Sequence, residues 1–296
     1  EGLTNDWGAN IGSVILRRQG SSLEKKAGAY AAAGSDARMS GCEKPVIIVS
    51  GSGNQGITAS VPVAVVAQEL GKTEEQLLKA VALSDLVTIH QKTGIGRLSA
   101  YCGAISAGCG AGAGIAYLLG GDAKAVAHTV VNAVAILSGT ICDGAKPSCA
   151  AKIAAAVDAG ILGYDMYLEG QQFYSGDGIV TKGVDNTVHN IGRLAREGMR
   201  QTDKTILEIM LSQMIYELTH KGKNIAVICC CCENDFAIAE SIFNSLCHIA
   251  AGQVVDSYLF AACRFQLLCQ HLNSFFSVAI DGSVGNYNAF TFRAVA

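Results

Sequence analysis

Charge is scarce in this sequence: 16% of its 296 residues are charged, whereas 50% are hydrophobic. Such a chain is not intrinsically disordered, because disorder requires low hydrophobicity and high net charge. Lysine and arginine number 22 against 25 aspartates and glutamates, so no basic excess is available to bind nucleic acid. We therefore expect a globular protein with a sizeable core and no nucleic-acid partner.

The sequence shows no signal peptide, no small disulfide scaffold and none of the usual zinc motifs. The residues after Glu1 contain no basic and apolar signal segment, so we expect a fragment that begins inside a longer protein. The chain holds twelve cysteines but is too long for a small secreted disulfide scaffold. No C-x₂-C pair occurs in residues 1–211. We expect reduced thiols and a cytoplasmic location.

Three stretches contain no Asp, Glu, Lys or Arg: residues 45–68, 98–121 and 125–142. The first two are long enough to span a bilayer. Glycine and small polar residues interrupt both of them, and flanking basic belts and interfacial Trp are missing. We therefore predict buried core helices and no membrane association, with a glycine-rich membrane protein as the weaker alternative.

The composition changes abruptly near residue 212. Residues 213–296 hold seven of the twelve cysteines and 11 of the 19 aromatic residues, but only four of the 34 glycines. We predict a catalytic domain over residues 1–211, and a tail over 212–296 that is unassigned, of uncertain α/β character, and either a small domain or a non-native continuation. Four consecutive cysteines at 229–232 have no explanation in the sequence.

Helical signals dominate residues 1–211, so the predicted fold class is mainly α. Thr73 and Gln76 form a capping box that opens a helix to about residue 90. Asp122 caps another helix that Gly139 ends, and an apolar stripe over 184–195 and a start near residue 202 indicate two more. There is no alternation of strands and helices, only a short β-like run at 46–49.

A glycine-rich loop follows that run and contains Ser50, Gly51, Ser52, Gly53, Asn54, Gln55 and Gly56. Its G-x-G-x-x-G spacing is typical of dinucleotide sites, but Pro62 falls where the cofactor helix would run, which disfavours that function. Its backbone N–H groups suit a carboxylate or phosphate, and a tight turn packed on a helix is the alternative. Asp36 and Arg38 are predicted to form an ion pair beside it.

Three cysteines have spacings that allow them to converge. Cys142 and Cys149 bracket a Gly/Pro loop, and Cys102 lies 40 residues before Cys142. Widely spaced thiolates favour an iron–sulfur cluster, and three ligands would leave one iron open as a Lewis acid. The alternative is that these cysteines pack as small apolar residues, which is what we expect for Cys42 and Cys109.

Several long motifs then indicate a family. The segments GSDARMSGCEKPVIIVSGSGNQGITASVPV, GRLSAYCGAISAGCGAGAGIAYLLGG and GTICDGAKPSCAAK resemble the L-cysteine desulfidase (cysteine desulfhydrase) family, which is related to the α subunit of iron–sulfur L-serine dehydratases. The resemblance covers about residues 1–211. It implies a mainly helical catalytic domain and a 4Fe–4S cluster. It also implies β-elimination from L-cysteine to pyruvate, ammonia and sulfide, without pyridoxal phosphate.

The resemblance also implies roles for single residues. Cys102, Cys142 and Cys149 would be the cluster ligands, and the loop over residues 50–56 would bind the carboxylate of the amino-acid substrate. Members of the family carry a further segment before the residue that is Glu1 here. We therefore expect a homo-oligomer or a separate chain that supplies it.

The base that removes the α-proton is not identified by the sequence. His90 and Lys92 are weak candidates, each with a solvated or pairing role as the alternative, while Asp143 and Lys146 would tune the cluster from outside its ligand set. L-Serine dehydration by the same mechanism is the alternative reaction. A further alternative is an inactive relative that only binds an amino acid or a cluster.

Overall fold

The computed structural model describes residues 1–96 and 99–221, with side chains as far as residue 212. These residues are helical, and their fold class is confirmed as mainly α. The elements are α1 (Ile11–Gln19), α2 (Leu23–Met39), α3 (Gly53–Glu69), α4 (Glu74–Ile95), α5 (Gly103–Leu118), α6 (Ala123–Ile136), α7 (Ser148–Leu168), α8 (Val184–Arg193), the π-helical turn η1 (Leu194–Gly198) and α9 (Arg200–Lys221).

Internal contacts divide the chain into two units, Glu1–Met210 and Leu211–Ala296. The descriptions below concern the first unit. The predicted division at residue 211 stays a prediction. Residues 212–221 of the predicted tail belong to α9, whereas the rest of the tail, whose α/β character was expected, and its four consecutive cysteines lie outside the described residues.

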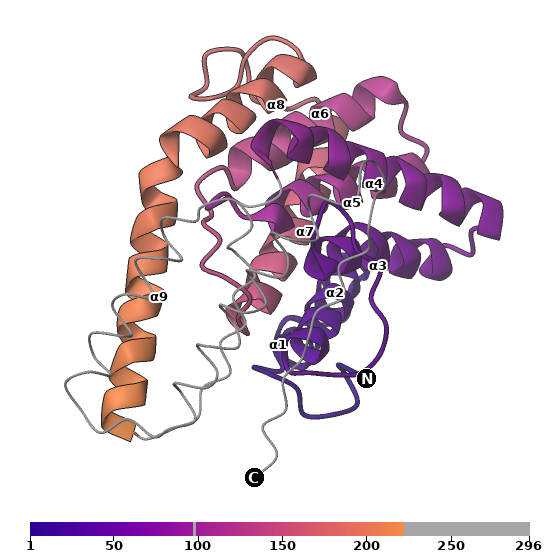
Figure 1. The fold of residues 1–296 in the computed structure, drawn as a ribbon. Coiled ribbons are helices and arrows are strands. Elements are labelled where there is room, and N and C mark those ends of the chain that lie inside the picture. Colours follow the sequence, from indigo (N-terminus) through magenta and orange to yellow (C-terminus); the bar gives the residue numbers. More distant parts are fainter. Residues whose placement is uncertain (97–98, 222–296) are drawn as a thin grey trace, which may run out of the picture. The chain divides into compact units, whose positions relative to one another are not determined.

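Helix α5 runs through the middle of the first unit and packs against α3, α4, α6 and α7 (Figure 1). It lies within the uncharged stretch 98–121, so the prediction of a buried core helix there is confirmed. Glycine lets α5 and α7 approach closely. A Cβ on Gly108 would lie 2.4 Å from the carbonyl oxygen of Ala156, and one on Gly160 would lie 2.4 Å from that of Gly108.

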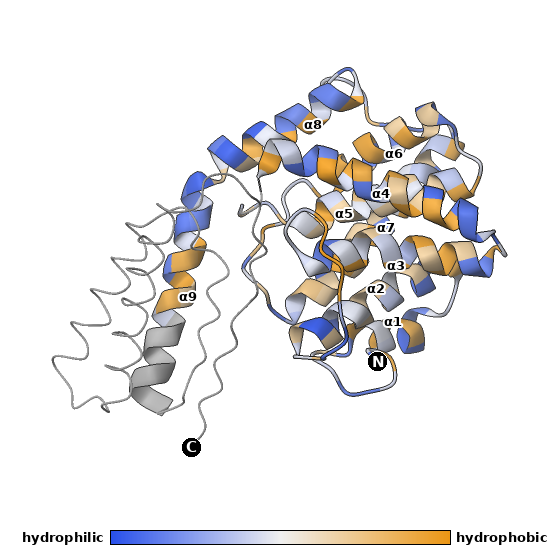
Figure 2. Ribbon diagram, turned by 45° about the vertical axis from the view of Figure 1, so that its right-hand side comes forward, coloured by the Kyte–Doolittle hydropathy of each residue, from blue (hydrophilic) through white to orange (hydrophobic). Residues whose placement is uncertain are grey.

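The predicted helix starts are largely confirmed. Thr73 and Gln76 form both hydrogen bonds of the capping box, and α4 continues to Ile95, past the expected end near residue 90. The Asp122 side chain accepts from the N–H of Ala125 at 2.8 Å and caps α6. That helix ends at Ile136, earlier than the predicted stop at Gly139. In Figure 2, α8 is largely hydrophilic, while Val188 and Ile191 of the predicted stripe are buried.

One expectation around the glycine-rich loop is wrong. The run 46–49 is not a strand, because its only pairing is an isolated bridge between Val49 and Ser52. The buried core helix predicted within residues 45–68 is confirmed as α3, which begins at Gly53 and contains Pro62. Proline removes one helical hydrogen bond, but Val63 and Val66 are buried beside it. Burial of that apolar face offsets the loss.

The predicted ion pair between Asp36 and Arg38 does not form. Asp36 is fully buried, and its carboxylate accepts from the backbone N–H groups of Ala9 at 3.3 Å and Ile11 at 2.7 Å. Burial raises the pKa of Asp36, and these two hydrogen bonds act in the opposite direction. The carboxylate thus caps α1 from α2, while Arg38 points to the glycine-rich loop. None of the helices described has the length and hydropathy needed to cross a bilayer.

Candidate functional site

Backbone pairing brings Cys102 and Cys142 together. Tyr101 forms an isolated antiparallel bridge with Ile141, and the N–H groups of Cys102 and Cys142 donate across it to Thr140 and Ala100, at 3.2 and 2.6 Å. Residues on either side of such a bridge point to the face opposite the bridging pair. The two thiols therefore share one face, although they are 40 positions apart in the sequence.

Cys149 approaches the same pair from α7. Its thiol donates to the carbonyl oxygen of Gly144 at 3.4 Å, and both Cys102 and Cys142 interact with it electrostatically. Burial raises the pKa of Cys102 to about 11 and also raises the pKa of Cys142. The thiols of Cys102 and Cys142 are therefore neutral at pH 7 until a cation binds them. The structure thus brings together all three cysteines that the sequence singled out.

Positive charge surrounds these thiols. Cys102 is the N-cap of α5, and Cys149 lies in the first turn of α7. Because helix N-termini carry a partial positive charge, both favour thiolate ligands. Lys92 is buried and interacts electrostatically with Cys102 and Cys142. Lys152, which sequence reasoning missed, interacts with Cys102 and Cys149.

The remaining polar candidates divide between the site and the surface. Asp143 forms an ion pair with Lys152 rather than with Lys146, whose side chain is exposed. His90 is exposed and its Nε2 lies 3.1 Å from a carboxylate oxygen of Asp185. Only the spacing of Lys152, one turn after Cys149 on a helix, was available in the sequence to indicate its position.

The glycine-rich loop ends in the N-terminus of α3. Its N-cap, Ser52, makes no side-chain cap hydrogen bond, so first-turn N–H groups stay available to an anion. Arg38 adds a full positive charge there. Its Nη1 donates to Oδ1 of Asn54 at 3.1 Å, and a Cβ on Gly53 would lie 2.4 Å from its Nε. A helix N-terminus and a guanidinium together can bind a carboxylate.

Gln55 connects this loop to the cysteines. Its side chain lies against the first residue of α5, where a Cβ on Gly103 would be 2.6 Å from Nε2 of Gln55. Gly103 directly follows Cys102 in the sequence, so the first turn of α3 and Cys102 are neighbours. Sequence spacing gave no sign of this contact, because 48 residues separate its two partners.

Among the described residues, no three His, Cys, Asp or Glu side chains are close enough to hold one metal ion. A cubane cluster binds each thiolate at a different iron, so its ligands lie further apart than those of a mononuclear site. Cys102, Cys142 and Cys149, with Lys92 and Lys152 nearby, are the residues that would hold such a cluster.

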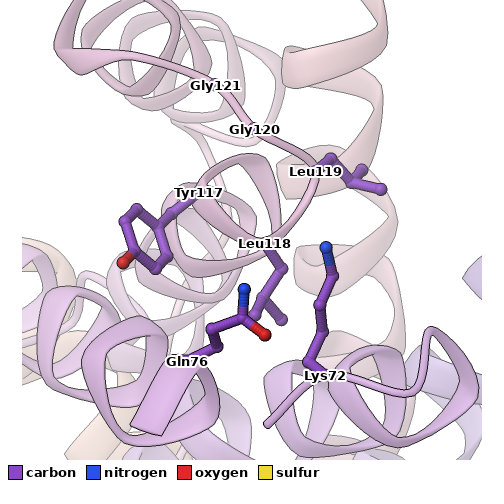
Figure 3. A pocket seen from close by; sticks show the side chains of 7 residues that line it. All are labelled: Lys72, Gln76, Tyr117, Leu118, Leu119, Gly120 and Gly121. Atoms are coloured by element: carbon purple, nitrogen blue, oxygen red, sulfur yellow. The ribbon is translucent and has the colours of Figure 1, made fainter.

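A cavity of about 350 Å³ lies at the other end of α5 (Figure 3). Its lining includes Lys72, Gln76, Tyr117 and Leu119. The length of α5 places it roughly 20 Å from Cys102, at a rise of about 1.5 Å per residue. It is therefore separate from the thiols and the glycine-rich loop.

The fold and the site define a helical protein with a thiol group beside an anion-binding helix end. Comparison with protein families gives the relationship: residues 2–208 match the family model described as serine dehydratase alpha chain. The chain belongs to this family, so its relationship to the α subunit of serine dehydratases is confirmed.

Similar proteins bear the name UPF0597 protein. One from Desulfitobacterium hafniense is 65% identical over 212 residues, which is 72% of this chain and 49% of the relative. One from Finegoldia magna is 49% identical over 213 residues, covering 72% and 51%, and one from Bacteroides fragilis is 42% identical over 222 residues, covering 73% and 50%. The chain spans about half the length of these curated relatives. No solved structure matches it.

Proposed function

We propose that this chain carries the cluster-binding part of a lyase that eliminates the β-substituent of a small amino acid. The proposed substrate is L-cysteine, which would give pyruvate, ammonia and sulfide. The observation that carries the proposal is the juxtaposition of Cys102, Cys142 and Cys149 with the anion-binding end of α3. L-Serine is the second candidate substrate, because the family is described by serine dehydration.

The three thiols would hold a 4Fe–4S cluster, and no pyridoxal phosphate is proposed. When bound, the cluster supplies a Lewis acid for the leaving group. The first turn of α3 and Arg38 hold the substrate carboxylate. Asp143 and Lys152 pair beside the cysteines and orient the loop that carries Cys142.

Lys92 is the proposed base for the α-proton. Burial lowers its pKa, and the neighbouring Cys142 and Cys102 act in the opposite direction. The position of Lys92 favours it over His90: Lys92 is buried against the thiols, whereas His90 is exposed and paired with Asp185. A base must lie within reach of the proton that it removes.

Iron and acid-labile sulfide content after anaerobic reconstitution tests the cluster. We expect about four of each per chain. Cys142→Ala should lose most of both, whereas Cys42→Ala, the same change at a half-buried thiol outside the group, should retain them. Equal iron in all three proteins would contradict the ligand assignment.

Pyruvate formation from L-cysteine and from L-serine, with sulfide measured alongside, tests the reaction. Lys92→Met should retain iron and lose at least about a hundredfold in rate, the usual contribution of a general base. Lys79→Met, at an exposed surface lysine, should have the same iron content and rate as the unchanged protein. A loaded chain that binds amino acid without forming pyruvate would leave only a binding role.

Because the match covers only about half of each relative, the proposal includes a partner. The remaining half of the family's polypeptide would be supplied by a separate chain, or two copies of this chain would associate. Reduced thiols and cluster assembly fit a cytoplasmic location. Adding a purified polypeptide with the other half of a relative should raise the rate if that half completes the site.

A further inference from the structure

Buried polar atoms without partners gather at the first turns of α5. Among the described residues, Oε1 of Gln55, Oε1 of Gln91 and Oγ of Ser106 are buried and make no hydrogen bond. Each of these side chains is at most 5% exposed. A buried acceptor without a donor costs about 1–3 kcal/mol, and native proteins rarely leave several together.

The three side chains come from three helices and lie along the first turns of α5. Gln55, from α3, lies against Gly103, and Ser106 is one turn further along α5 on the same face. Gln91, from α4, donates through Nε2 to the carbonyl oxygen of Ser106 at 3.3 Å and to that of Val87 at 3.4 Å.

Those two carbonyl groups fix the orientation of the Gln91 amide. Both are acceptors, so the NH₂ group must face them, and both lone pairs of Oε1 stay free. Oε1 of Gln91 therefore presents only an acceptor, and the Ser106 hydroxyl can accept as well as donate. A protonated amine, which has three N–H donors and no acceptor, suits these oxygens, whereas a carboxylate would find no donor at Oε1 of Gln91.

We propose that Gln91, together with Gln55 and Ser106, binds the α-ammonium group of the substrate. This inference rests on the proposed function, which places the substrate carboxylate at the first turn of α3. Gln55 belongs to that same turn, so the ammonium and carboxylate sites adjoin, as they must for two groups on one carbon atom. The site would then select α-amino acids over their α-hydroxy analogues.

Calorimetric titration of the intact chain with L-serine and L-glycerate tests this selection, because glycerate carries a hydroxyl group in place of the amine. The unchanged protein should prefer L-serine by roughly tenfold or more, as expected for hydrogen bonds to a charged group. Gln91→Met retains the side-chain volume and removes the acceptor. It should weaken L-serine binding by about that factor and leave glycerate binding unchanged.

Gln68→Met makes the same change at an exposed position of α3 and should leave both affinities unchanged. Ser106→Ala provides a smaller truncation in case Gln91→Met does not fold, and it should reduce the preference for L-serine in the same direction. If the variants weaken both ligands equally, or leave the preference unchanged while folding normally, the three side chains hold only a buried water and the inference is overturned.

The titration requires neither cluster nor turnover, so it separates the two proposals. Selective L-serine binding without pyruvate formation would support the ammonium site and contradict the elimination. Pyruvate formation with an unchanged preference in Gln91→Met would support the elimination and overturn the ammonium site.

Discussion

The two glycine-rich segments of this protein have similar compositions and use glycine for different physical reasons. In the loop over residues 50–56, Gly51 has a φ of 88° and Ser50 one of 49°, so the backbone enters α3 through conformations that most side chains disfavour. In α5, glycine has ordinary helical geometry, and Gly108, Gly110 and Gly112 instead admit neighbouring backbones.

The difference shows what composition does and does not reveal. A glycine that sets backbone conformation is replaceable by another residue that tolerates positive φ, whereas a glycine that provides space is not replaceable by anything larger. The first kind shapes the site directly, because it sets how the backbone enters α3. The second kind sets the distance between α5 and its neighbours, on which the position of Cys102 depends.

Gly108→Ala should have the largest effect on the stability of the fold. Its Cβ would lie 2.4 Å from the carbonyl oxygen of Ala156, and backbone on both sides restricts any adjustment. We expect a loss of about 3 kcal/mol in the free energy of unfolding, measured by urea denaturation. Gly139→Ala, where nothing lies within 4 Å of the added carbon, should stay within about 0.5 kcal/mol.

Gly51→Ala should lower the free energy of unfolding by less, about 1–2 kcal/mol, because alanine disfavours the positive φ of this position. The sharper measurement compares asparagine at both positions. Gly51→Asn should be more stable than Gly51→Ala, since Asn tolerates positive φ, while Gly108→Asn should be less stable than Gly108→Ala. The same order at both positions would remove the distinction between the two segments.

Arg38→Met should have the smallest effect on stability, below about 1 kcal/mol, because Arg38 is half-buried and its side chain makes a single hydrogen bond with the loop, to Asn54. On the proposed function, it should still raise KM for the amino acid about tenfold through loss of a charge from the anion site. Arg17→Met, at an exposed position on α1, is the matched control and should change neither quantity.

Local signals in the sequence predicted the helices well. The capping box at Thr73 and the cap at Asp122 are interactions within one helix turn, so their residues can be recognised by spacing alone. The helical content, the burial of α5 and the relationship to serine dehydratases followed from pattern and motif. All of these predictions depend on neighbours along the chain.

Contacts between distant segments account for what the sequence did not predict. Asp36 and Arg38 are two positions apart and suggested a pair, yet Asp36 caps α1 and Arg38 reaches Asn54. Pro62 disfavoured a cofactor-binding helix, yet α3 runs through it, because burial against other helices offsets the local cost of a proline. The proximity of Lys92 to the thiols depends on how α4 packs, which spacing does not encode.

The bridge between Tyr101 and Ile141 has a consequence for the replacement of a damaged cluster. It places Cys102 and Cys142 on one face through backbone hydrogen bonds, which link the two segments independently of their side chains. If the proposed cluster were destroyed by oxygen, this pairing would help to keep the two sulfur atoms in place for a new one. On the proposed function, activity would then return through resupply of iron and sulfide, without synthesis of a new polypeptide.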